Sequence, residues 1–319
     1  MLTVSHQRCT LTLVREGSVE RGAVERGPRL DALIELDNDR FREAVSAPHT
    51  VQFTHALHDH PLLALPPIAD LADRLAKDSV ICERAAKPLL MPEGGPPRGA
   101  EPRPGDLIRD LDHSGSWLTL LDIGQDSLYR DLVDSCLDQV EPLVNARPGD
   151  MRQRVGFVFV SSPNSITPVH YDIEHSLILQ ISGAKTLIVG EFPDVGARQH
   201  ELERYWSDGS HGRMASVPPE RVRYELSPGV GVYVPPFVPH WVYNSNAPSL
   251  SVTLTFYTRD SEDDIILQVV NSRLRRIGLS PRRPGESPWL DRVKVRMVRL
   301  YGLRHRLWKQ RRPVEQAMY

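Results

Sequence analysis

The stretch between residues 155 and 257 most constrains the fold, because it is a series of short β-rich segments separated by turn residues. Val, Ile, Leu, Phe, Thr and Tyr fill the segments, while Pro, Gly, Asn and Asp stand between them. Many short strands with turn signals between them indicate a sandwich or a barrel. The expected strands cover residues 155–160, 176–181, 186–189, 231–234, 241–243 and 249–257.

The segments on either side of this stretch carry the periodicity of helices. Apolar residues at helical spacing predict a helix that opens near residue 126 and buries Leu132, Cys136 and Val140. We therefore expect a mainly β protein with flanking helices. Its expected parts are an irregular leader (1–30), an N-terminal α/β segment that packs on the barrel (31–150), a barrel core (151–260) and a basic helical segment (261–319).

Positive charge is concentrated at the C-terminal end of the chain. Residues 271–319 contain 14 Lys and Arg against 3 Asp and Glu, a local charge of 14 − 3 = +11, although the whole chain has a net charge of −2. Helices are expected at 260–276 and 290–308, and in the second Val293, Met297 and Leu300 lie on one apolar stripe. We expect this stripe to pack on the barrel or on a second subunit, and we favour that over a nucleic-acid or membrane-surface role.

Cysteine usage and hydropathy favour a cytoplasmic protein. Cys9, Cys82 and Cys136 are odd in number and form no CxxC pair, so neither a disulfide framework nor a zinc site is predicted. The N-terminus lacks a basic region followed by an apolar stretch, which argues against a signal peptide. No run approaches the roughly 18 apolar residues of a membrane-spanning helix.

One short segment places a histidine and a carboxylate two residues apart. His170 and Asp172 lie in Thr-Pro-Val-His-Tyr-Asp at 167–172, which reads as a strand followed by a turn. The best candidate for a third ligand is His240, 70 residues downstream and directly after a proline-rich strand end. Two imidazoles and one carboxylate on one face of a metal form the triad of non-haem Fe(II) oxygenases. We therefore predict an iron site at His170, Asp172 and His240.

These motifs resemble those of the JmjC and cupin-like Fe(II)/2-oxoglutarate oxygenases, particularly the branch of the asparaginyl hydroxylase that inhibits hypoxia-inducible factor. The resemblance covers roughly residues 155–257 and rests on three matches. They are the TPxHxD-like segment (Thr167, Pro168, His170 and Asp172), a Gly-x-Lys turn (Gly183 and Lys185), and two prolines before the distal histidine (Pro235, Pro236 and His240).

The resemblance implies a double-stranded β-helix, that is, a cupin or jelly-roll barrel of JmjC type. It implies Fe(II) as cofactor, 2-oxoglutarate as cosubstrate, and hydroxylation of a peptide, a protein side chain or a small metabolite by dioxygen. Lys185 and Thr167 match the residues that hold the far carboxylate of 2-oxoglutarate. The C-terminal helices would form a homodimer, as they do in the resembled hydroxylases.

Two positions depart from the resembled branch. Ser176 and Thr255 stand where the asparaginyl hydroxylase has asparagines, and both can still form hydrogen bonds with the cofactor. An alternative function is a non-catalytic cupin that binds a metal or ligand and acts through its basic tail. A zinc or manganese cupin of isomerase type would need Glu174 and His175 as further ligands, whereas we expect His175 at the rim of the pocket.

The remaining histidines and long loops carry weaker signals. His55, His58 and His60 straddle a strand-to-helix connection and are expected to be structural. Residues 91–105 are rich in Pro and Gly and predict a surface loop or lid. Residues 191–223 have no steady period and predict a long insertion over the barrel mouth, with His200 and His211 on its surface. We expect these two loops to select the substrate.

Overall fold

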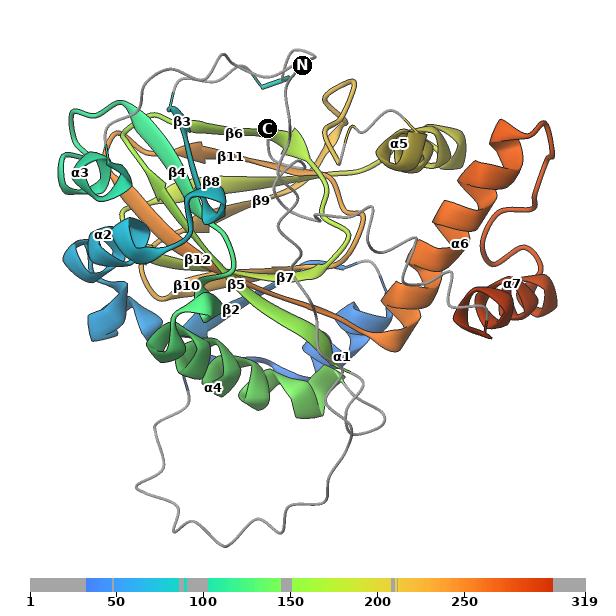
Figure 1. The fold of residues 1–319 in the computed structure, drawn as a ribbon, viewed down its shortest axis with the longest axis horizontal. Helices are drawn as coiled ribbons and strands as arrows, with labels where there is room; N and C mark the ends of the chain where they lie inside the picture. The colour runs from blue at the N-terminus through green and yellow to red at the C-terminus, as the bar shows by residue number, and fades with distance from the viewer. Residues whose placement is uncertain are drawn as a thin grey trace, which may run out of the picture. The chain divides into compact units, whose positions relative to one another are not determined.

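The computed structural model describes residues 33–47, 49–85, 89–90, 103–144, 151–207, 210 and 212–300, which form two antiparallel β-sheets with flanking helices (Figure 1). The predicted leader (1–30) and residues 91–102 of the predicted lid lie outside these ranges. The strands are β1 (Ile34–Glu35), β2 (Val51–His55), β3 (Val80–Arg84), β4 (Ser116–Leu120), β5 (Arg152–Ser161), β6 (Ile166–His170), β7 (His175–Ser182), β8 (Lys185–Gly190), β9 (Glu220–Leu226), β10 (Val230–Val234), β11 (His240–Asn244) and β12 (Ser249–Tyr257). The α-helices are α1 (Asn38–Ser46), α2 (Leu65–Arg74), α3 (Pro104–Arg109), α4 (Ser127–Val144), α5 (Val195–Ser207), α6 (Arg259–Arg276) and α7 (Pro288–Leu300).

Strands β5 to β12 form a double-stranded β-helix. Strand β5 pairs with β12, β6 with β11, β7 with β10 and β8 with β9, so the first strand meets the last and the pairing continues inward. This long antiparallel ribbon is rolled into two sheets, because β5, β7, β10 and β12 belong to one and β6, β8, β9 and β11 to the other. The predicted jelly-roll fold is therefore confirmed.

The N-terminal strands extend the larger sheet at both of its edges. Strand β2 pairs with β10 and strand β4 pairs with β5, which gives the order β1-β2-β10-β7-β12-β5-β4-β3. Helices α1, α2 and α4 cover the face of this sheet that points away from the small sheet. Their apolar side chains share one buried cluster with the strands, for example Leu132 and Cys136 of α4 with Val158 and Leu177.

The opposite face of the larger sheet meets the small sheet across the barrel interior. Along β7, Leu177 and Leu179 belong to the cluster under the helices, whereas Ile178 packs with Leu187 of the small sheet. Side chains of a strand alternate between its faces, so a strand buried on both sides carries two different sets. Every residue of strand β12 is buried, so its side chains are covered on both faces of the sheet.

Residues 191–223 are more regular than predicted. Helix α5 lies in this range and strand β9 begins in it at Glu220, so the range contains regular elements although its sequence has no steady period. Helix α5 buries Leu202 and Tyr205 in a cluster with Tyr171 and Ile265 of α6. Two buried apolar positions in a 13-residue helix are too few to produce a visible period in the sequence.

Helix α7 packs through a different face from the one predicted. Val295 and Val298 are buried against residues of α6, whereas the predicted stripe is exposed. The side chains of Val293, Met297 and Leu300 are 43%, 53% and 82% exposed, so these three residues do not pack on the barrel. The remainder of the predicted helix lies beyond residue 300, outside the described part of the chain. Within the part described, no helix is both long and apolar enough to cross a membrane.

Candidate metal centre and its cavity

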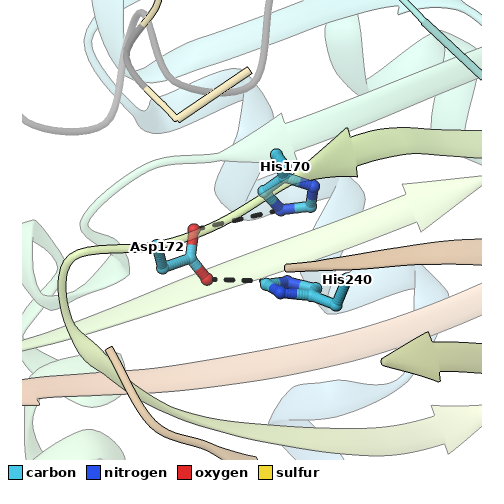
Figure 2. A group of neighbouring side chains, drawn as sticks. All are labelled: His170, Asp172 and His240. Carbon is cyan, nitrogen blue, oxygen red and sulfur yellow. Dashed lines mark ion pairs between the residues drawn. The ribbon is translucent and has the colours of Figure 1, made fainter. Parts of the chain in front are cut away.

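Two paired strands bring the predicted metal ligands together. His170 is the last residue of β6 and is paired directly with His240, the first residue of β11. Asp172 follows β6 by two residues, and its carbonyl accepts a hydrogen bond of 2.7 Å from the backbone N–H of Phe237. Figure 2 shows the three side chains converging from these segments. Asp172 is thereby held by the segment that leads into β11.

The three side chains place their ligand atoms close to one another. The Nε2 atoms of His170 and His240 lie 3.9 Å and 3.7 Å from the two carboxylate oxygens of Asp172 (Figure 2). One ligand atom from each residue can be chosen so that all lie within 4.8 Å of one another. Among the residues that the structure describes, this is the group of His, Cys, Asp and Glu side chains suited to a metal ion.

Backbone carbonyls orient both imidazole rings. Nδ1 of His170 lies 2.8 Å from the carbonyl oxygen of Pro168, and Nδ1 of His240 lies 3.0 Å from that of Val238. A carbonyl only accepts, so each Nδ1 carries a proton and donates it, and each Nε2 is the nitrogen that faces Asp172. Metal-binding histidines are oriented in this way by their second ring nitrogen.

The donor set therefore fits a divalent iron. Two imidazole nitrogens and one carboxylate supply three protein ligands of the types that Fe(II) accepts, and they leave adjacent positions for other ligands. Ser176 supports the carboxylate from behind, since its hydroxyl donates a hydrogen bond of 3.3 Å to Asp172 Oδ2. The site thus contains three metal ligands, and each of them is held by a hydrogen bond to a neighbouring group.

A β-bulge brings Thr167 to the same cavity. Along β11, His240 and Val242 are two residues apart, but their partners His170 and Thr167 on β6 are three apart. The extra residue in β6 reverses the alternation, so Thr167 and His170 both face inward. Both line a cavity between the two sheets, together with Asp172, His240 and Lys185.

Lys185 forms the other end of this cavity. Its side chain is 7% exposed, and its ammonium group donates a hydrogen bond of 2.8 Å to the hydroxyl of Ser251 on β12. Burial lowers the pKa of Lys185 to about 7, from the ordinary 10.5. Among the described residues no carboxylate forms an ion pair with it. A buried cation without an anion is costly, so this end of the cavity is suited to an anionic ligand.

Strand β12 lines the cavity with hydroxyl groups, which the sequence analysis recognised only in part. Ser251, Thr253 and Thr255 all face the cavity, while Leu250, Val252 and Leu254 face the cluster under the helices. The printed sequence from 249 to 256 alternates strictly between hydroxyl and apolar residues. This alternation was the signal that could have identified Ser251 and Thr253.

Most of the predicted site residues meet at one place. His170, Asp172, His240, Thr167, Lys185 and Thr255 line the cavity. Ser176 is different, because it is fully buried, does not line the cavity and contacts Asp172 instead. The structure gives it a contact with a predicted metal ligand, and its contact with the cofactor stays a prediction.

The other histidines of the described chain lie away from the metal group. His175 was predicted at the rim of the pocket, and this prediction is wrong. Its ring stacks on Phe256 with ring centroids 4.9 Å apart, and its Nδ1 lies 2.7 Å from the hydroxyl of Tyr233. Burial lowers the pKa of His175 to about 3. His55 and His58 lie in the β2 region apart from the metal group, with ring centroids 6.2 Å apart, and His200 is exposed on α5. His211 lies outside the described residues.

An apolar wall completes the cavity. Trp117 of β4 and Phe159 of β5 contact each other with ring centroids 6.0 Å apart, and Phe157 continues the wall along β5. Ile178 of β7 lines the same side. Ser161 of β5 and Glu174 also line the cavity, and a mainly apolar wall with a few polar groups is typical of small-ligand sites.

No protein-family model and no curated protein matches the chain. Among solved structures, the chain is similar to one of YcfD from Escherichia coli, with 16% identity, a TM-score of 0.48, and coverage of 88% of this chain and 70% of that chain. It is also similar to YcfD, a ribosomal oxygenase, in complex with cobalt and 2-oxoglutarate, with 14% identity, a TM-score of 0.46, and coverage of 84% and 67%. A third similar structure is the complex of YcfD with cobalt and succinic acid, with 15% identity and a TM-score of 0.45. The match covers 88% of this chain and 69% of that chain. The fold of this chain is assigned from its own strand order and register.

Proposed function

We propose that the protein is an Fe(II)- and 2-oxoglutarate-dependent dioxygenase that hydroxylates a peptide, a protein side chain or a small metabolite. One observation carries the proposal: a His-Asp-His group and a buried lysine without a carboxylate partner share one cavity. The first suits a divalent metal and the second suits an anion. 2-Oxoglutarate can bind at both ends, because it has a 2-oxo acid group for the metal and a second carboxylate for the lysine.

His170, Asp172 and His240 would hold the iron through Nε2, a carboxylate oxygen and Nε2. Iron and 2-oxoglutarate, when bound, supply the chemistry that uses dioxygen to hydroxylate a C–H bond. Thr167 and Lys185 would receive the second carboxylate, and Thr255 would offer a hydroxyl to the cosubstrate near the metal end. The apolar wall that contains Trp117 and Phe157 would exclude water from this space.

Iron-dependent release of succinate tests this function directly. Wild-type protein with Fe(II), 2-oxoglutarate and dioxygen should form succinate, and His240→Ala should not. Uncoupled turnover without the true substrate is slow, so the assay runs at high enzyme concentration against the variant as background. If metal and 2-oxoglutarate bind but no succinate forms with any substrate pool, the protein is instead a non-catalytic binding cupin.

Within the oxygenases, we propose that the chain resembles the asparaginyl hydroxylase branch. The support is the TPxHxD-like segment at 167–172, the lysine at 185 and the proline-rich approach to His240. Ser176 and Thr255 are the points that separate it from that branch. A protein or peptide substrate is consistent with the resemblance, and its identity would be tested by incubation with peptide libraries and detection of a mass increase of one oxygen.

We also propose that the protein is a cytoplasmic homodimer with four parts, 1–30, 31–150, 151–260 and 261–319. The support for a dimer is the set of exposed apolar side chains on and before α7, which a second copy could cover. They are Ile277, Leu279, Trp289, Val293, Met297 and Leu300. Cys136 is a free thiol, which is compatible with a reducing compartment. Sedimentation of wild type and of Val293→Glu tests the dimer, and we assign no nucleic-acid partner to the basic tail.

A further inference from the structure

Ser251 is neither a predicted metal ligand nor a predicted cofactor residue, yet it contacts Lys185. It lies in the centre of β12, is 1% exposed, and faces the cavity from the large sheet. Lys185 reaches across from β8 of the small sheet, and its ammonium group donates to Ser251 Oγ at 2.8 Å. This hydrogen bond therefore joins the two sheets inside the cavity.

The bond leaves unused donors on both residues. A protonated lysine has three N–H donors, and Ser251 accepts one of them. The hydroxyl proton of Ser251 has no acceptor among the described residues. Two N–H groups and one O–H group are therefore available at the same place, and all of them are donors. Such a group favours a carboxylate, since an ionised carboxylate only accepts hydrogen bonds.

The neighbours of Ser251 explain why this hydroxyl differs from the others on the strand. Ser251 lies opposite Gln180 on one side and Phe159 on the other, so no second charged group faces it from either adjacent strand. Thr255, at the other end of the row, lies opposite Ser176, which in turn contacts Asp172. The hydroxyls of β12 thus connect the lysine end of the cavity with the metal end.

We infer that Ser251 positions the Lys185 ammonium group and donates its own hydroxyl proton to the second carboxylate of the cosubstrate. In this role Ser251 raises the affinity for a 2-oxo acid with a second carboxylate relative to one with an apolar end. The inference rests on the proposed function, because it takes 2-oxoglutarate as the ligand. It adds a specificity-determining residue that motif comparison did not identify.

The test compares two ligands that differ only at the far end. 2-Oxopentanoate has the length of 2-oxoglutarate but carries a methyl group in place of the second carboxylate. Calorimetric titration of the Mn(II)-loaded protein without dioxygen gives the affinity for each ligand, and no turnover is needed. Wild type should prefer 2-oxoglutarate. Ser251→Ala should reduce the affinity for 2-oxoglutarate about tenfold, the effect of one hydrogen bond to a charged group, and change that for 2-oxopentanoate less than about twofold.

Two further variants separate positioning from packing. Ser251→Cys keeps nearly the same volume with a much weaker donor, so it should show the same selective loss even if the alanine variant folds poorly. Ser249→Ala is the matched control, because Ser249 is equally buried on the same strand but bonds to Gln180 and does not line the cavity. It should leave the affinities for both ligands unchanged.

The outcomes distinguish this inference from the function on which it rests. A wild-type protein that binds Mn(II) but neither ligand refutes the proposed function and the inference with it. Unchanged preference for 2-oxoglutarate in both Ser251 variants refutes the inference alone. An equal loss of affinity for the two ligands also refutes it, since it would show that Ser251 supports the cavity without contacting the second carboxylate.

Discussion

The metal end of the cavity and the lysine end differ in how far the protein completes their hydrogen bonds. At the metal end, His170 and His240 each have a carbonyl partner, and Asp172 accepts from Ser176. At the lysine end, the buried ammonium group has a single serine hydroxyl as its partner in the described residues. The first end is arranged to keep its geometry before any ligand binds. The second retains unused donors that a ligand must satisfy.

This difference predicts opposite effects on stability and binding at the two ends. Removing a group from the metal end should cost metal affinity and disturb a completed network. Removing the cation at the lysine end should cost ligand affinity while it relieves the cost of burying a charge.

The largest effect is expected from the metal ligands. His170→Ala, Asp172→Ala or His240→Ala should each lower the affinity for Fe(II) or Mn(II) by more than about 100-fold, because substitutions even in the supporting shell cost 10–100-fold. Calorimetry and measured metal content would give the affinities. His200→Ala, at an exposed position on α5, is the control and should bind metal normally. Normal metal occupancy in His170→Ala would contradict the ligand assignment.

Lys185→Met should separate ligand binding from stability. We expect about 100-fold weaker binding of 2-oxoglutarate, since a charge-assisted contact is lost, with metal affinity retained. The free energy of unfolding should rise, because the variant no longer buries an amine among apolar groups. Chemical denaturation measures the second effect, and Lys77→Met on the surface serves as the control. A lower free energy of unfolding for Lys185→Met would show that the buried lysine stabilises the free protein, and it would contradict the need for an anionic ligand.

Binding at the lysine end should depend on pH. Burial lowers the pKa of Lys185 to about 7 in the free protein, so the amine is largely neutral above that pH, whereas the unfolded chain keeps its proton up to about 10.5. A bound carboxylate favours the charged form and raises the pKa, so 2-oxoglutarate binding should take up a proton above pH 7. Affinity should then fall with rising pH by up to about tenfold per unit.

Calorimetry at pH 8 in two buffers with different ionisation enthalpies measures this proton uptake. The linked proton should disappear in Lys185→Met, which isolates the contribution of this one amine. Binding of 2-oxoglutarate to wild type without proton uptake at pH 8 would show that Lys185 is already protonated in the free protein.

The smallest effect is expected at Ser176. Ser176→Ala removes the hydroxyl that donates to Asp172 and should weaken metal binding about tenfold. The preference for 2-oxoglutarate over 2-oxopentanoate should stay unchanged, because Ser176 does not line the cavity. A changed preference with normal metal affinity would reverse this assignment and return Ser176 to the cofactor role that the sequence predicted.

The strands of the barrel could be predicted because their period is local. Alternation and turn residues identified the segments around β5, β7, β8, β10, β11 and β12, and all six are strands in the structure. Strand β9 was missed because its residues, Glu220 to Leu226, are mostly charged and exposed. Helix α5 was missed because it has few buried positions.

Parts of the site depend on contacts that no local pattern contains. Strict alternation would place Thr167 and His170 on opposite faces of β6, and only the bulge brings them together. The contact of Lys185 with Ser251 joins residues 66 positions apart in opposite sheets. His175 was misplaced because the sequence does not show that it faces the aromatic rings of Tyr233 and Phe256.

The proposed function requires one cavity to bind iron at its metal end and the second carboxylate of 2-oxoglutarate at its lysine end. The most direct measurement is an anaerobic titration of the Fe(II)-loaded protein with 2-oxoglutarate, followed by visible absorption. Wild type should develop the weak charge-transfer band of an iron chelated by a 2-oxo acid, and Lys185→Met should need about 100-fold more ligand to reach it. Absence of the band in the iron-loaded wild type would contradict the binding of 2-oxoglutarate to iron in this cavity.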